Sequence, residues 1–182
     1  VYLAVWTTTP WSLLGNMALA VRADAAYVLV RRMETHELYI VAEDLAESLA
    51  SVPAGRPGES GTLGPFEKVA TVAGADLVGS TYECPWMLPT EERFLMNAPF
   101  VTTDAGTGIV HMAPAHGQED YEVWRDAGFL KKYGLKSPVD ALGRLVTDAS
   151  WGLNDVIRAD VARLHGLEAL GDGTERLLQL LD

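Results

Sequence analysis

Two segments of this 182-residue chain hold the side chains that could bind and transform a small polar ligand. The first, at positions 6–11, reads Trp-Thr-Thr-Thr-Pro-Trp. The second, at positions 104–120, runs from a glycine turn through an apolar stretch to a histidine and ends on a carboxylate. Hydroxyl groups both donate and accept hydrogen bonds, so a threonine cluster can hold a carbonyl, a sugar hydroxyl or a water molecule. Together the two segments predict a pocket for a polar ligand and a water.

The three threonines are predicted to occupy two faces of one extended segment. Successive side chains of a strand point to opposite sides, so Thr7 and Thr9 share a face and Thr8 points away. Pro10 favours an extended backbone at Thr9. A plain structural explanation stays open, because threonine is common in strands. Asn16, slightly further on, is either a turn residue or offers its amide to the pocket.

The second segment holds two histidines and a carboxylate whose roles the sequence leaves open. His111 stands where an apolar strand should end, a place where a structural histidine is commoner than a catalyst. His116 falls in a loop, where exposure to solvent is the simpler expectation. Asp120 falls in the first turn of an expected helix, where free backbone amides and the helix dipole stabilise negative charge. It either stabilises that helix or stays ionised to pair with a ligand ammonium group.

Charge and composition limit the possible functions. The net charge is −11, whereas proteins that bind nucleic acids on their own are usually basic. Another part of a larger molecule must therefore hold most of any polynucleotide substrate. Cys84 is the only cysteine, which excludes an internal disulfide, and every apolar run is too short to span a bilayer. The chain begins at Val1 in what reads as mid-strand, so we expect a piece of something longer.

Short apolar and β-branched runs separated by turns predict an α+β fold with a mostly antiparallel β-barrel core decorated with short α-helices. With 48% apolar residues, the chain can bury a substantial core, and we expect a single domain over residues 1–182. Strands are expected at residues 1–6, 18–22, 26–33, 37–42, 66–72, 77–82, 93–101, 108–112 and 139–147. Helices are expected at residues 43–51, 118–128, 154–165 and 174–181.

In order and spacing, the two segments resemble the editing domain (CP1) of class I aminoacyl-tRNA synthetases, specifically of the isoleucyl type. The matching residues are Trp-Thr-Thr-Thr-Pro-Trp at 6–11 with Gly-Asn at 15–16, and Gly-Thr-Gly-Ile-Val-His-Met-Ala-Pro at 106–114 with Gly-Gln-Glu-Asp at 117–120. Valyl and leucyl relatives typically have arginine where this chain has Thr9. The resemblance spans nearly the whole chain and is least clear over residues 55–94.

The resemblance implies a role for each residue of the predicted site. Asp120 would bind the α-ammonium of a misattached valine, and His111 would help to bar isoleucine. Thr8 and Thr9 would contact the substrate and the attacking water, which makes these two threonines and Asp120 the expected catalytic residues. The remaining substrate-binding residues are expected to be Trp6, Thr7 and Asn16.

The implied function is hydrolysis of valyl-tRNA(Ile) inside an isoleucine–tRNA ligase, with valyl-adenylate left open as a further substrate. The His-x-Gly-His and Lys-Met-Ser-Lys-Ser signatures of the synthetic site do not occur in the sequence, so the chain alone should not charge tRNA. No cofactor or metal is expected in this domain, while the parent enzyme would use ATP and Mg²⁺. Expected partners are the 3′ end of mischarged tRNA(Ile) and the rest of the synthetase. No membrane is expected as a partner, and the chain should be monomeric and cytoplasmic, with an organellar parent left open.

Two other classes of function stay open at this point. His111, His116, Glu119 and Asp120 combine imidazole and carboxylate groups, which suit several divalent cations, so a metal-dependent hydrolase is one alternative. The glycine turn and the threonine cluster also suit a non-enzymatic β-barrel module that only binds a small ligand. Release of valine from its ester over time would separate an enzyme from a binding module.

Overall fold

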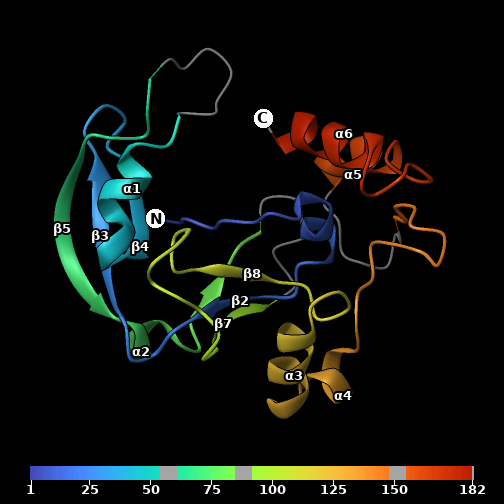
Figure 1. The fold of residues 1–182 in the computed structure, drawn as a ribbon, viewed down its shortest axis with the longest axis horizontal. Coiled ribbons are helices and arrows are strands. Elements are labelled where there is room, and N and C mark those ends of the chain that lie inside the picture. Colours follow the sequence, from blue (N-terminus) through green and yellow to red (C-terminus); the bar gives the residue numbers. More distant parts are fainter. Residues whose placement is uncertain (54–60, 85–91, 148–154, 182) are drawn as a thin grey trace. The chain divides into compact units, whose positions relative to one another are not determined.

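The computed structural model of the chain describes residues 1–53, 61–84, 92–147 and 155–181 (Figure 1). The chain forms two compact units, each built from three separate segments. The first unit comprises Val1–Thr7, Leu19–Ser80 and Leu95–His111, and the second comprises Thr8–Ala18, Thr81–Phe94 and Met112–Asp182. The division falls inside the threonine segment and directly after His111. The expectation of one domain over residues 1–182 stays a prediction.

A four-stranded sheet forms much of the first unit. Its strands, in spatial order, are β1 (Tyr2–Leu3), β4 (Leu38–Ala42), β3 (Ala26–Arg32) and β5 (Phe66–Ala73). The central strand β3 pairs antiparallel with β4 and β5, and β1 pairs parallel with β4. β3 is rich in β-branched and aromatic residues, and it buries Tyr27, Val28 and Val30. The three longer predicted strands are confirmed, whereas the one at residues 1–6 is reduced to two residues.

Short helices complete the first unit. The helix expected at 43–51 is present as η2 (Glu43–Leu45) followed by α1 (Ala46–Ala50), and it buries Leu45 and Leu49 as its spacing predicted. The strand expected at 77–82 is reduced to β6 (Thr81–Tyr82), because its start belongs to α2 (Gly74–Leu77). Gly74 sits so close to the Arg22 carbonyl oxygen that a Cβ there would lie 2.0 Å from it. A glycine therefore permits the tight turn into α2.

The second sheet has the strand order β6 (Thr81–Tyr82), β7 (Arg93–Asn97), β2 (Ala18–Val21) and β8 (Val110–Met112). The described strands thus form two open sheets, each with two edge strands, and the predicted barrel core is wrong. Barrel closure needs edge strands long enough to pair with a definite stagger, and β1 and β6 contribute only two residues each. The fold is a mixed α+β fold with two small sheets.

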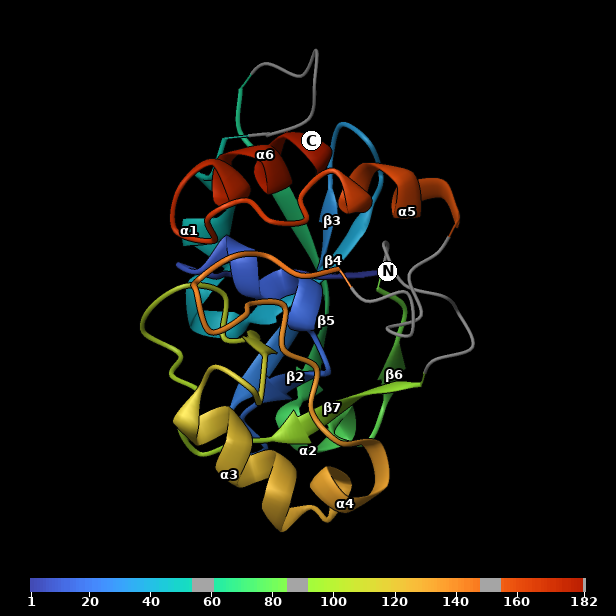
Figure 2. The ribbon, with the colours of Figure 1, turned by 90° about the vertical axis from the view of Figure 1, so that its right-hand side faces the viewer.

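The second unit is mostly helical among its described residues. It contains η1 (Pro10–Gly15), α3 (Gln118–Asp126), α4 (Phe129–Tyr133), α5 (Asp155–Ala162) and α6 (Asp172–Leu181). The helices expected at 118–128, 154–165 and 174–181 are confirmed, with residue 154 lying outside the described residues. In Figure 2, α3 leads into α4 and α6 lies on η1, where the two elements are in contact.

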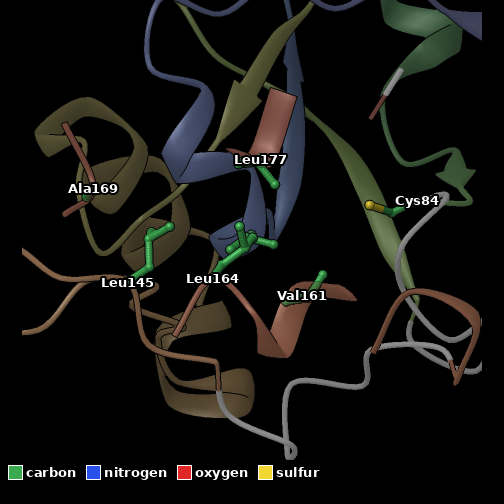
Figure 3. Packing of buried hydrophobic residues seen from close by; sticks show 7 residues of the cluster. Cys84, Leu145, Val161, Leu164, Ala169 and Leu177 are labelled. Carbon is green, nitrogen blue, oxygen red and sulfur yellow. The ribbon is translucent and has the colours of Figure 1, made fainter. Parts of the chain in front are cut away.

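A cluster of buried apolar side chains holds η1, α5 and α6 together (Figure 3). Leu14 of η1 packs with Leu145, Leu164 and Leu177, all of which are at most 1% exposed. Complete burial of one leucine stabilises a fold by roughly 1.5–3 kcal/mol, so this cluster fixes η1 against α6. The position of η1 matters because η1 begins directly after the threonine segment.

The strand expected at 139–147 is wrong, and its residues form a turn with isolated bridges. Val139 is bridged to Leu145, and Arg144 to Glu168. The Asp140 carboxylate accepts the backbone N–H groups of Leu142 and Arg144, at 2.8 and 2.9 Å, and this local bonding competes with a strand. No helix among the described residues is long and apolar enough to cross a membrane.

Candidate functional site

Thr9 begins η1 and takes part in a small hydroxyl network with Ser12. The Ser12 hydroxyl donates to the Thr9 carbonyl oxygen at 2.7 Å, and the hydroxyl oxygens of the two residues are 3.3 Å apart. Because the single Ser12 proton is used in the shorter bond, Thr9 Oγ1 is the donor in the longer one. The lone pairs of Thr9 Oγ1 are therefore not used by Ser12. Thr8 and Thr9 are both exposed, as substrate-contacting hydroxyls must be.

Asn16, at the other end of η1, is buried and its amide serves the fold. Its Nδ2 donates to the Ala18 carbonyl oxygen at 3.0 Å, and its Oδ1 accepts a short hydrogen bond from the Tyr82 hydroxyl. Burial raises the pKa of Tyr82, so that hydroxyl keeps its proton. Asn16 thereby fixes η1 to β6, and a direct contact between Asn16 and a ligand stays a prediction.

Asp120 clamps the turn that follows β8. Its Oδ2 accepts the Ala113 backbone N–H at 2.8 Å, across a turn closed by N–H groups of His116 and Gly117 bonding to the Ala113 carbonyl oxygen. Gly117 makes room for the carboxylate, since a Cβ there would lie 2.7 Å from Oδ2. The other oxygen, Oδ1, accepts no hydrogen bond from any described residue. Asp120 is half-buried, so it offers a partly desolvated negative oxygen.

The surroundings of Asp120 disfavour its ionised form, whereas the sequence predicted that the start of the helix would stabilise that form. Burial raises the pKa of Asp120, the Ala113 amide lowers it, and the nearby charge of Glu119 raises it further; the net pKa lies above the ordinary value. The favourable field at the start of α3 is thus outweighed by desolvation. A carboxylate in this state gains from a cationic partner, because an opposite charge favours the ionised form.

Two aromatic rings connect η1 to the turn that Asp120 clamps. Trp11 and His116 meet edge to face, with ring centroids 5.0 Å apart and an angle of 86° between the rings. His116 Nε2 lies 3.2 Å from Ser137 Oγ, which donates its own proton to the Val139 carbonyl oxygen at 2.9 Å. His116 is therefore the donor to Ser137 through its Nε2–H. The expected exposure of His116 is confirmed, and partial burial lowers the pKa of its ring.

The glycine turn before β8 belongs to the first unit and is held by hydrogen bonds from two residues, Tyr27 and Ala42. The buried Tyr27 hydroxyl donates to the Gly108 carbonyl oxygen at 2.8 Å and accepts the Arg22 backbone N–H at 2.9 Å. The Ala42 backbone N–H donates to the Thr107 carbonyl oxygen at 2.9 Å. Gly108 has a φ of +70°, and a Cβ there would lie 2.4 Å from the Ala42 Cβ. Only glycine fits this position without strain.

His111 follows this turn on β8 and is buried, with 7% of its surface exposed. Trp6 is bridged to Val110 on the same strand, and 57% of its surface is exposed. Thr7, next to Trp6, is half-buried. The first unit therefore holds Trp6, Thr7 and His111, while Thr8, Thr9, Asn16 and Asp120 belong to the second unit. All three expected catalytic residues belong to the second unit.

The geometry also identifies supporting residues that sequence reasoning missed. Ser12 bonds to Thr9, Gly117 leaves room for the Asp120 carboxylate, and Tyr27 holds the glycine turn before β8. Of these three residues, only Gly117 had a signal in the sequence. It stands directly before an expected helix that has a carboxylate in its first turn. For the metal alternative, the described residues contain no group of three or more His, Cys, Asp or Glu side chains arranged to hold an ion.

Comparison with solved structures defines the class of this fold. The CP1 domain of a leucyl-tRNA synthetase (GlLeuRS-CP1) matches 98% of the chain and 79% of its own length, with a TM-score of 0.64 and 20% identity. The editing domain of the cytosolic leucyl-tRNA synthetase of P. knowlesi matches 98% of the chain with a TM-score of 0.60 and 13% identity. The chain thus has the fold of a synthetase editing domain.

Comparison of sequences gives the particular family, although no family model matches the chain. The isoleucine–tRNA ligase of Gloeothece citriformis is 38% identical over 175 residues, and that of Thermosynechococcus vestitus is 40% identical over 175 residues. Each alignment covers 92% of this chain and 17% of the relative. The chain belongs to the isoleucyl-tRNA synthetase family and spans about one-sixth of the length of these relatives.

Proposed function

We propose that this chain is the hydrolytic editing domain of an isoleucyl-tRNA synthetase and that it removes valine from mischarged valyl-tRNA(Ile). The observation that carries the proposal is the carboxylate of Asp120, which is half-buried, has one oxygen fixed by Ala113 and has the other without a partner among the described residues. A valyl ester presents a free ammonium group, which is the partner that such an oxygen binds most strongly. An uncharged ligand could donate a hydrogen bond to that oxygen but would not neutralise its charge, and a carboxylate ligand would be repelled by it.

The exposed hydroxyls of Thr8 and Thr9 supply the second requirement, a place for the attacking water. Both belong to the same unit as Asp120, and the Trp11–His116 contact joins η1 to the clamped turn. In this proposal the ammonium is held by Asp120, and the threonine hydroxyls orient the water and stabilise the developing oxyanion. Positioning supplies much of the rate enhancement. The neighbouring hydroxyl of the terminal ribose is the candidate proton relay, which takes a proton from the attacking water as it passes its own to the leaving ribose oxygen.

Selectivity requires a further element, because one methylene in an apolar pocket discriminates by only about 10–200-fold. We assign His111 as the steric bar against isoleucine, with Trp6, Thr7 and Asn16 shaping the pocket. The buried position of His111 on β8 supports a fixed bar better than a mobile one. The domain would need no cofactor, while ATP and Mg²⁺ would serve the synthetic site of the parent enzyme. The acidic chain would rely on the parent enzyme to hold most of the tRNA.

A deacylation time course with the chain and radiolabelled valyl-tRNA(Ile) tests this proposal. We expect steady release of valine at high substrate concentration, since the charge of −11 predicts weak capture of tRNA. Asp120→Asn keeps an acceptor for the Ala113 N–H but removes the charge. A charged hydrogen bond contributes about 1.5–3 kcal/mol, so release should slow by roughly 10- to 150-fold. Asp126→Asn, at the exposed end of the same helix, is the matched control and should release valine at the wild-type rate.

Each alternative predicts a different result in the same assay. A folded Asp120→Asn variant with wild-type release would reject the role of Asp120. Retention of the ester without any release of valine would favour the binding module. Complete loss of activity with a chelator, restored by one added metal, would favour the metal hydrolase.

A further inference from the structure

The side chain of Tyr27 is fully buried in the first unit, and its hydroxyl makes two hydrogen bonds to backbone groups, one close by in the sequence and one far away. It accepts the Arg22 N–H at 2.9 Å and donates to the Gly108 carbonyl oxygen at 2.8 Å, 81 positions further along the chain. Tyr27 also lies directly opposite Ala42 in the β3–β4 register. Ala42 donates its N–H to the Thr107 carbonyl oxygen at 2.9 Å. Two neighbouring residues of one sheet thus donate hydrogen bonds to two consecutive carbonyl groups of the glycine turn.

We propose that Tyr27 is a positioning residue for substrate selection. Its hydroxyl fixes the Gly106–Gly108 turn, and this turn determines how far the His111 side chain projects from β8. This proposal rests on the function proposed above, in which His111 is the bar against isoleucine. His111 is only three residues beyond Gly108, and a strand transmits displacements of its start along its whole length. The Thr107 hydroxyl, which donates to the Ile109 carbonyl oxygen at 3.2 Å, makes the same turn stiff from within.

The two bonds of the Tyr27 hydroxyl use its one proton and one of its lone pairs, so removal of the hydroxyl has a defined consequence. Tyr27→Phe leaves the buried Gly108 carbonyl and the half-buried Arg22 N–H without this partner while keeping the ring in the core. Backbone groups that lose a buried partner move towards another one or towards water. The turn should therefore shift, and the position of His111 should become less well defined.

The test measures hydrolysis of valyl-tRNA(Ile) and isoleucyl-tRNA(Ile) by the same preparation of each variant. The ratio of the two values of kcat/KM does not depend on the fraction of folded protein, so a merely structural defect would leave it unchanged. For Tyr27→Phe we expect the ratio of kcat/KM for the valyl ester to that for the isoleucyl ester to fall by about tenfold. This is the lower end of the discrimination that one methylene provides. Most of the fall should come from faster hydrolysis of the isoleucyl ester.

Tyr39→Phe is the matched control. Tyr39 lies on β4 of the same sheet, and its hydroxyl donates to the Glu37 carboxylate at 3.1 Å, away from the glycine turn. Its ratio should equal that of the wild type. Equal ratios for Tyr27→Phe and Tyr39→Phe would overturn the positioning role.

Thr107→Val keeps the proposal testable where Tyr27→Phe is too unstable to assay. This nearly isosteric change removes the hydrogen bond to Ile109 inside the same turn, and we expect a fall in the ratio of a few-fold. An unchanged ratio in a folded Thr107→Val variant would also contradict the proposal. Failure of the wild-type chain to hydrolyse the valyl ester would instead reject the proposed function itself, so the two failures are distinguishable.

Discussion

The two turns that flank β8 are each held by a side-chain oxygen, but the two oxygens differ in charge and in how many partners they have. Before β8, the neutral hydroxyl of Tyr27 is fully buried and both donates and accepts a hydrogen bond. After β8, the carboxylate of Asp120 is half-buried and holds the Ala113 N–H with one oxygen only. The Tyr27 hydroxyl thus has both of its hydrogen-bond partners within the protein, whereas the second oxygen of the Asp120 carboxylate has none among the described residues.

In the proposed function, this difference separates a residue that shapes the site, Tyr27, from one that binds the ligand, Asp120. A buried polar group without a partner costs about 1–3 kcal/mol, so a structural clamp uses its hydrogen-bonding groups within the fold. Asp120 departs from that rule, and such departures are expected at functional sites. Changes at the first turn should therefore act mainly on stability and selectivity, and changes at the second mainly on activity.

Gly108→Ala should have the largest effect on stability. The new Cβ would lie 2.4 Å from the Ala42 Cβ at a φ of +70°, which combines backbone strain of about 1–2 kcal/mol with a core overlap that costs about 1–3 kcal/mol. We expect the free energy of unfolding to fall by about 3 kcal/mol in urea denaturation. Gly128→Ala has a similar φ of +76° but open space around the new Cβ, so it should lose only about 1 kcal/mol. Equal losses in the two variants would mean that the contact with Ala42 does not hold the turn.

Gly117→Ala should have a smaller effect on stability and a large one on activity. At a φ of −109° alanine is not strained, but its Cβ would lie 2.7 Å from Asp120 Oδ2, so the carboxylate must move. Loss of the Ala113 bond should cost about 1–2 kcal/mol, and release of valine should slow at least as much as in Asp120→Asn.

Gly171→Ala is the control for that experiment, because its Cβ would meet the Glu168 carboxylate at an ordinary 3.7 Å. It should change stability by less than about 0.5 kcal/mol and leave release of valine unchanged. If Gly117→Ala were as active as Gly171→Ala, the position of the Asp120 carboxylate would not matter for hydrolysis.

Much of the fold was predictable where local pattern and burial agree. The runs that became β3, β4 and α3 are such cases, and the structure places them as the sequence predicted. β5 was also predicted, although most of its residues are exposed. The errors lie where one local contact overrides propensity, as at Gly74 and at Asp140. The barrel was wrong because closure depends on the length of edge strands, which propensity does not specify.

The residues of the site stay a prediction, and most of the residues that support them could not be found from the sequence. The threonines and Asp120 stand in compact motifs, and the fold exposes Thr8 and Thr9 and leaves one oxygen of Asp120 without a described partner. Tyr27 carries no local sign of its role, because its partner Gly108 is 81 positions away. Asn16 was expected at the ligand, but its amide bonds to Ala18 and Tyr82, which a single sequence could not reveal.

The smallest predicted effect concerns pH, and at Asp120 it has opposite signs for stability and for ligand binding. Burial raises the pKa of Asp120 above its ordinary 3.8, so between the ordinary and raised values the folded chain binds more protons than the unfolded chain. Its contribution to stability is therefore present at pH values below 3.8 and is lost as pH rises through the raised pKa. Binding of an ammonium ligand has the opposite sign, because only the ionised carboxylate pairs with it.

The measurement compares the wild type with Asp120→Asn across that pH range. Stability of the wild type relative to the variant should fall with rising pH, while affinity for a non-hydrolysable valyl-adenosine mimic should rise and then level off. Tyr27→Phe should leave both pH dependences unchanged, since burial raises the pKa of Tyr27 above 10, far outside this range. If ligand affinity fell with rising pH, as stability does, the ammonium would not be held by the carboxylate of Asp120. The difference in hydrogen bonding between Tyr27 and Asp120 would then have no bearing on function.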